Sequence, residues 1–140
     1  MMNSKKIIFG FSAFTAVGIT AYWSLVFAGL FPVEEVIPGY KHWFMSFAVA
    51  DFWIAINSIL LAISIKKDNI KKSIIFGLIT ASSMIFLGLY ALLYGINTGL
   101  IFNLTVDELI EIAIKVYCLS VGAYFIKHFS HDINKIPKSV

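Results

Sequence analysis

Three ionisable residues lie within long apolar stretches of the sequence: Asp51, Glu111 and Lys115. A charge at the centre of a bilayer costs at least ~2.5–3.5 kcal/mol, so such residues normally face the protein interior and have partners. Glu111 and Lys115 are four residues apart in the favourable order, so in a helix they share a face and can form an ion pair. These side chains are therefore the first candidates for ligand binding or for acid and base chemistry.

The helix faces that carry these charges also carry smaller polar side chains. Helical periodicity places Cys118 on the face of Glu111 and Lys115, and it places Ser58 on the face of Asp51. If the two faces meet, two carboxylates and one ammonium give a net negative charge that favours a cation. We therefore predict a ligand-binding site formed by these five residues, and the sequence identifies no catalytic residue.

A purely structural reading of the same charges stays open. An ion pair between Asp51 and Lys115 would fix which helix faces pair, while Glu111 reaches water near the membrane surface. This reading accounts for every charge without a ligand. Proton relay or catalysis is a third reading of the cluster.

The elements that must position these residues follow from the composition. The chain has 140 residues, of which 59% are hydrophobic and 14% charged, with a mean hydropathy of +0.86. An ordinary soluble domain has roughly 45–50% apolar and about 25% charged residues, so a water-soluble globule is excluded. Four stretches can each cross ~30 Å of hydrocarbon; they are residues 7–31, 43–65, 73–95 and 106–126. We predict an all-α membrane protein, an antiparallel up-down four-transmembrane-helix bundle, in one domain that covers residues 1–140.

The lysines predict the orientation of these helices. All eleven basic residues are lysine, and with four spans nine of them fall on one side of the membrane. The nine are Lys5, Lys6, Lys66, Lys67, Lys71, Lys72, Lys127, Lys135 and Lys138. Short loops rich in lysine stay in the cytoplasm, so we expect a multi-pass protein of the cell membrane with both termini cytoplasmic.

Small residues and helix signals predict packing faces and helix ends. Small residues recur every four positions from Ser12 through Ala16, Thr20 and Ser24 to Ala28, and a second ridge contains Ser73, Gly77 and Ala81. Thr105 and Glu108 have the spacing of a capping box at the start of the last helix. Tyr22 and Trp23 are expected in an aromatic belt at the membrane interface.

Several classes of partner are excluded or unsupported. A chain without arginine lacks the planar fork that grips phosphates, so we expect no nucleic-acid partner. No histidine lies within a predicted span to hold a haem, and His128, His131 and Asp132 are expected to be solvated. The sequence predicts no cofactor and no metal.

The segment Trp43-Phe44-Met45-Ser46-Phe47, followed by Asp51, resembles the corresponding segment of four-helix EXPERA-type membrane proteins. That family includes sterol isomerases and a sigma-type receptor. The resemblance implies a cavity for a hydrophobic amine or a sterol-like molecule, and it assigns Asp51 to that cavity. The same pattern also fits other small four-helix integral membrane families.

Three functional hypotheses follow from this pattern. In the first, an outward-facing acidic site within the membrane binds or carries a small hydrophobic or cationic molecule. In the second, the chain is an accessory or scaffolding subunit that docks onto a larger membrane complex or onto a second copy. In the third, it is a membrane isomerase-like enzyme. In all three the lipid bilayer is a partner.

Overall fold

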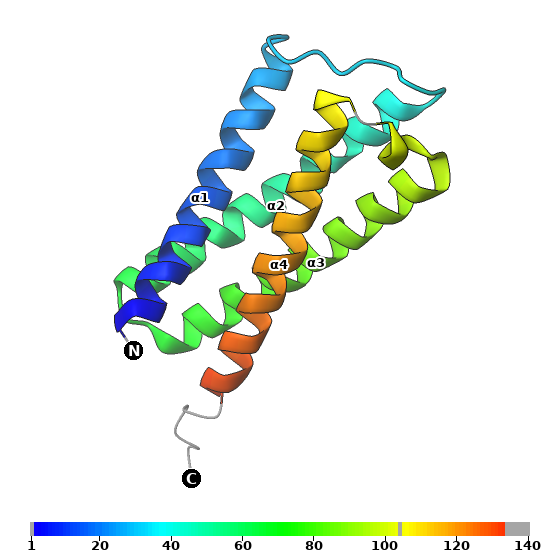
Figure 1. The fold of residues 1–140 in the computed structure, drawn as a ribbon. Coiled ribbons are helices and arrows are strands. Elements are labelled where there is room, and N and C mark those ends of the chain that lie inside the picture. Colours follow the sequence, from blue (N-terminus) through cyan, green and yellow to red (C-terminus); the bar gives the residue numbers. More distant parts are fainter. Residues whose placement is uncertain (1, 104, 134–140) are drawn as a thin grey trace. The chain divides into compact units, whose positions relative to one another are not determined.

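The structure is a computed structural model that describes residues 2–103 and 105–133, without the side chains of residues 2 and 3. Its elements are, in order, α1 (Met2–Phe27), α2 (Tyr40–Lys66), α3 (Ile70–Thr98), a short 3-10 helix η1 (Leu100–Phe102) and α4 (Val106–Ile133) (Figure 1). No strand occurs among the described residues. The prediction of an all-α chain with four long helices is therefore confirmed.

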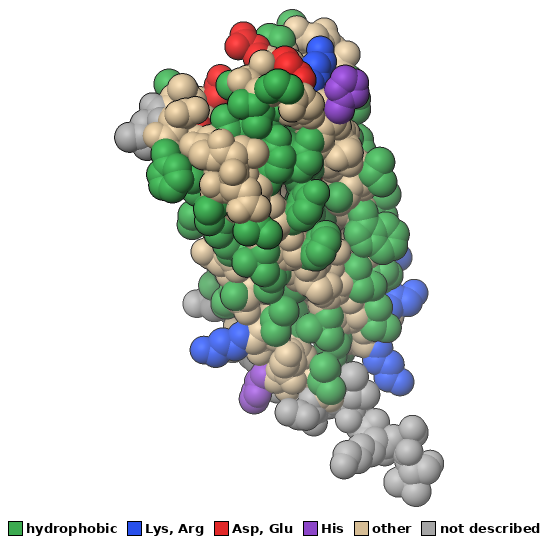
Figure 2. All heavy atoms as spheres, turned by 90° about the vertical axis from the view of Figure 1, so that its right-hand side faces the viewer, with side chains coloured by type: hydrophobic (Ala, Val, Ile, Leu, Met, Phe, Trp, Pro, Cys, Tyr) green, Lys and Arg blue, Asp and Glu red, His purple; other side chains and the backbone are tan. Residues whose placement is uncertain are grey.

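Each of the four α-helices is long and apolar enough to cross a membrane. Hydrophobic side chains cover the long sides of the helices, and charged side chains gather near helix ends (Figure 2). The chain divides into two compact units, Met1–Asn69 and Ile70–Val140. The first unit contains α1 and α2, and the second contains α3, η1 and α4.

In the first unit, α1 packs against α2 along its length. Near the start of α1, Lys5 Nζ lies 2.5 Å from Asp68 Oδ1, just beyond the end of α2. Toward the other end of α1, Trp23 forms a buried cluster with Val26 and Ala48. The start of α1 therefore lies beside the end of α2.

In the second unit, glycines allow α3 and α4 to approach closely. Gly77 lies directly against the ring of Phe129, and a Cβ placed on Gly122 would be 3.0 Å from the carbonyl oxygen of Ala81. Close backbone approach is how helices associate in lipid, where apolar burial gives no advantage. Ser73, Gly77 and Ala81 are all buried. The second predicted ridge is therefore a packing face.

The helix ends differ from the predicted limits. We expected the first helix to reach residue 31, but α1 ends at Phe27 because Gly29 adopts a φ of 72° and its N–H donates to the Val26 carbonyl. A left-handed glycine is a common way to end a helix. α3 and α4 continue past residues 95 and 126, to Thr98 and Ile133. Lys135 and Lys138 lie outside the described residues.

The first predicted ridge is buried at only two of its five residues. Ser12 and Ala16 are buried. The other three members, Thr20, Ser24 and Ala28, are exposed. A helix has 3.6 residues per turn, so each step of four residues rotates the ridge by about 40°, and three steps rotate it by about 120°. The buried face of α1 passes to Trp23 and Val26 instead.

Candidate functional site

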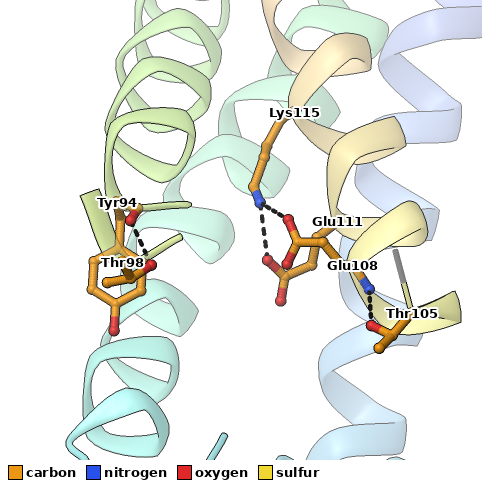
Figure 3. Close-up of polar contacts among 6 residues, drawn as sticks. All are labelled: Tyr94, Thr98, Thr105, Glu108, Glu111 and Lys115. Atoms are coloured by element: carbon orange, nitrogen blue, oxygen red, sulfur yellow. Dashed lines mark hydrogen bonds and ion pairs between the residues drawn. The ribbon is translucent and has the colours of Figure 1, made fainter. Parts of the chain in front are cut away.

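An ion cluster lies near the start of α4 (Figure 3). The ammonium of Lys115 is 3.1 Å from Glu108 Oε1 and 3.1 Å from Glu111 Oε2. The side chains of Lys115 and Glu108 are buried, with exposed fractions of 7% and 9%, whereas that of Glu111 is 24% exposed. The Lys115 ammonium thus forms ion pairs with two carboxylates, and the three groups together have a formal net charge of −1.

Helical spacing places the three side chains on one face of α4. Glu108, Glu111 and Lys115 are separated by three and four residues, which are the spacings of neighbours on one helix face. Gly95 of α3 lies beside the ammonium, because a Cβ at that position would be in ordinary contact with Lys115 Nζ at 3.6 Å. The predicted pair of Glu111 and Lys115 is therefore present, and it has a third member.

The third member, Glu108, was expected to act only at the helix start. Half of the predicted capping box is present, because the Glu108 N–H donates to Thr105 Oγ1 at 3.3 Å. The Glu108 carboxylate bonds Lys115, and the Thr105 N–H donates to the carbonyl of Asn103. The seven-residue spacing from Glu108 to Lys115, two helical turns, was the sequence signal for this bond.

Asp51 has a partner within the first unit. The indole Nε1–H of Trp23 donates to Asp51 Oδ2 at 2.8 Å and joins α1 to α2. Trp23 is only 1% exposed, so its side chain packs inside the first unit, and its expected place in an interfacial belt stays a prediction. One oxygen of the Asp51 carboxylate, which the sequence analysis assigned to ligand binding, thus accepts a hydrogen bond from a neutral donor.

The remaining predicted site residues divide between the same two units. Ser58 lies on α2 and is fully buried, and its hydroxyl has no hydrogen-bond partner among the described residues. Ser64, further along α2, shows the usual arrangement, because its hydroxyl donates to the Leu60 carbonyl at 2.7 Å. Cys118 is half-buried on α4. The meeting of all five residues in one site stays a prediction.

No three histidine, cysteine, aspartate or glutamate side chains lie close enough to hold a metal ion within residues 2–103 and 105–133. His128 Nε2 lies 3.2 Å from Asp132 Oδ2, one turn further along α4. This pair joins residues that the sequence analysis expected to be solvated.

Comparisons with protein-family models, with curated proteins and with solved structures find no match to this chain. The resemblance of residues 43–51 to EXPERA-type proteins stays a prediction from the sequence.

Proposed function

We propose that this chain is an integral membrane protein of four antiparallel helices, with both termini in the cytoplasm, that binds or carries a small hydrophobic or cationic molecule. Four helices of sufficient length and apolarity support the membrane location. The lysines of the connections and ends support the orientation, because short basic loops are retained in the cytoplasm.

The observation that carries this proposal is the sharing of Lys115 by Glu108 and Glu111. Ionisable groups inside a membrane protein are costly, and they commonly mark ligand or ion pathways. The net charge of −1 favours a positively charged ligand, and the apolar surroundings of a membrane helix favour one with hydrophobic substituents. Glu111 is the more exposed carboxylate, so we assign the ligand contact to Glu111 and the positioning of Lys115 to Glu108.

Binding of tetraphenylphosphonium, a permanent hydrophobic cation, tests this assignment. Equilibrium dialysis of the purified full chain in detergent should show saturable binding, which Glu111→Gln weakens about tenfold, a loss of ~1.4 kcal/mol. Asp107→Asn is the matched control, because Asp107 lies one turn before Glu111 on α4 and is exposed. Triphenylphosphine oxide, a neutral molecule of similar shape, should bind more weakly than the cation.

Equal binding of the cation and the neutral analogue would contradict a charge-selective site. An unchanged affinity in Glu111→Gln, or an equal loss in Asp107→Asn, would contradict the assignment of Glu111. Thermal unfolding of each variant distinguishes a lost contact from a lost fold.

A second candidate function, docking to a larger membrane complex or to a second copy, has its own supporting observation. Thr20 and Ser24 on α1, and Ala28 just beyond its end, are exposed small residues spaced four apart. The hydroxyls of Thr20 and Ser24 donate to carbonyls of their own helix, so these side chains are compact and suited to close helix contact. Ser24→Leu should reduce oligomerisation in nanodiscs, measured by cross-linking, if these residues form an interface. Unchanged cross-linking would favour the binding function alone.

A further inference from the structure

We propose that the first unit binds the headgroup of an anionic membrane lipid where the start of α1 meets the end of α2. We call this surface the basic end. Its charged residues are Lys5, Lys6, Lys66, Lys67 and Asp68. The inference rests on the membrane location proposed above, and it concerns a site separate from the acidic cluster of α4.

Two contacts bring the two helix ends together. Lys5 forms an ion pair with Asp68, and the ammonium of Lys66 lies 5.0 Å from the centre of the Phe9 ring. All five charged residues of the basic end are exposed. Four lysines and one aspartate leave a net charge of +3 on this surface.

Apolar side chains lie one helical turn deeper than each lysine pair. Phe9 follows the two α1 lysines by three and four residues, so it shares their helix face. Ile63 precedes Lys66, the last residue of α2, by three residues and Lys67, the next residue, by four. Phe9 is half-buried, and Ile63 is 43% exposed. The surface therefore passes from positive charge to apolar side chains along the helix axes.

This order of charge and apolar surface matches an anionic lipid. The lipid phosphate would lie among the ammonium groups, and the upper part of an acyl chain would lie beside Phe9 and Ile63. Basic residues next to the end of a membrane helix attract anionic lipids by about 1 kcal/mol for each residue. A free phosphate ion would make no use of the apolar side chains, so the geometry favours the lipid.

The test measures which lipid the full chain immobilises. The chain is placed in phosphatidylcholine nanodiscs that contain a small fraction of spin-labelled phosphatidylglycerol or spin-labelled phosphatidylcholine, and electron paramagnetic resonance gives the motionally restricted fraction of each. We expect the wild type to prefer phosphatidylglycerol about fivefold, the equivalent of one lysine. The variant Lys6→Gln/Lys67→Gln should lose most of this preference, and neither substitution removes the Lys5–Asp68 or Lys66–Phe9 contact.

Lys41→Gln is the matched control, because Lys41 is an exposed lysine at the opposite end of α2. We expect this variant to keep the wild-type preference. An equal loss in Lys41→Gln would overturn the proposal, because the preference would then follow total charge. Displacement of labelled phosphatidylglycerol by soluble glycerol phosphate would also overturn it, because the site would then recognise the anion alone.

Two further measurements keep the result decisive. If the double variant does not fold, the wild-type preference should fall as sodium chloride rises from about 50 mM to about 500 mM, and a constant preference would overturn the proposal. Size-exclusion chromatography of nanodiscs made only of phosphatidylcholine reports membrane insertion. Failure to insert would contradict the proposed function itself, whereas insertion without a preference for phosphatidylglycerol would contradict only the basic end.

Discussion

Glu35 determines how the connection between α1 and α2 meets the start of α2. Its Oε1 accepts the Gly39 N–H at 2.5 Å, and its Oε2 accepts the Lys41 N–H at 2.9 Å. The backbone hydrogen bonds from Lys41 and then Gly39 hold the pKa of Glu35 below its ordinary value of 4.5. These bonds satisfy amides at a helix start, a role that shorter side chains usually have.

The pH dependence of this cap has a definite sign. Because the pKa of Glu35 is lower in the folded chain, its stabilising contribution is complete above pH 4.5 and is lost as the pH falls through the lowered pKa. We expect acidification to shift the NMR amide signals of Gly39 and Lys41, and Glu35→Gln to produce a similar shift at neutral pH. Glu34→Gln is the control, because the neighbouring carboxylate is also exposed. Equal responses in the two variants would contradict the cap.

The bond between Trp23 and Asp51 predicts a stability effect. Trp23→Phe removes the indole donor and leaves Asp51 Oδ2 without it, so we expect the free energy of unfolding to fall by about 1–3 kcal/mol. Trp53→Phe should have a smaller effect, because Trp53 is 54% exposed. Denaturation in detergent, followed by circular dichroism, measures both. Adding Asp51→Leu to Trp23→Phe should recover part of the loss, and a strictly additive double variant would show that the bond contributes nothing.

At the scale of helices, the packing of α3 against α4 depends on glycine. A Cβ on Gly122 would meet the Ala81 carbonyl oxygen at 3.0 Å and Ile85 Cγ1 at 2.7 Å, so Gly122→Ala must displace backbone as well as side chain. We expect overpacking to destabilise the chain by about 1–3 kcal/mol. Gly10→Ala meets nothing within 4 Å, and it should stabilise α1 by up to about 1 kcal/mol. Thermal unfolding in detergent should therefore move in opposite directions for the two variants.

Local patterns predicted the elements well because apolar length and short spacings act within one helix. The four helices follow from apolar runs, and the ion pair of Glu111 and Lys115 follows from a spacing of four residues. Gly29 was overlooked because the apolar run continues past it, although its left-handed φ ends α1.

Partners that depend on two helices, or on a choice between two local roles, were not predictable in the same way. Trp23 donates to Asp51, which lies 28 residues later in the chain on another helix. The position of Trp23 near a helix end had favoured an interfacial role. Glu108 has the spacing of a cap and also the spacing of a partner for Lys115. In the structure the Glu108 amide bonds Thr105 at the helix start, and the Glu108 carboxylate bonds Lys115. The sequence alone does not specify this division of roles.

At the scale of the whole molecule, each unit has its own charge asymmetry. In the first unit, Glu34 and Glu35 lie in the connection from α1 to α2, while the basic end lies at the other ends of the two helices. In the second unit, Glu108 and Glu111 lie near the start of α4, and Lys127 lies near its end. Both units therefore predict the same orientation without any reference to how they pack together.

Cysteine labelling tests this orientation directly. In a chain that carries Cys118→Ala, we expect Asn69→Cys to be labelled only after the cells are permeabilised, because it lies between the lysines of α2 and those of α3. Val36→Cys, in the connection beside Glu35, should react with an impermeant maleimide added to intact cells, because residue 36 is 58% exposed. The pair serves as its own control, since the impermeant maleimide should label position 36 but not position 69 in intact cells, and both positions after permeabilisation. Labelling of position 69 from outside intact cells would reverse the orientation, and it would place the acidic cluster of α4 toward the cytoplasm and the basic end toward the exterior.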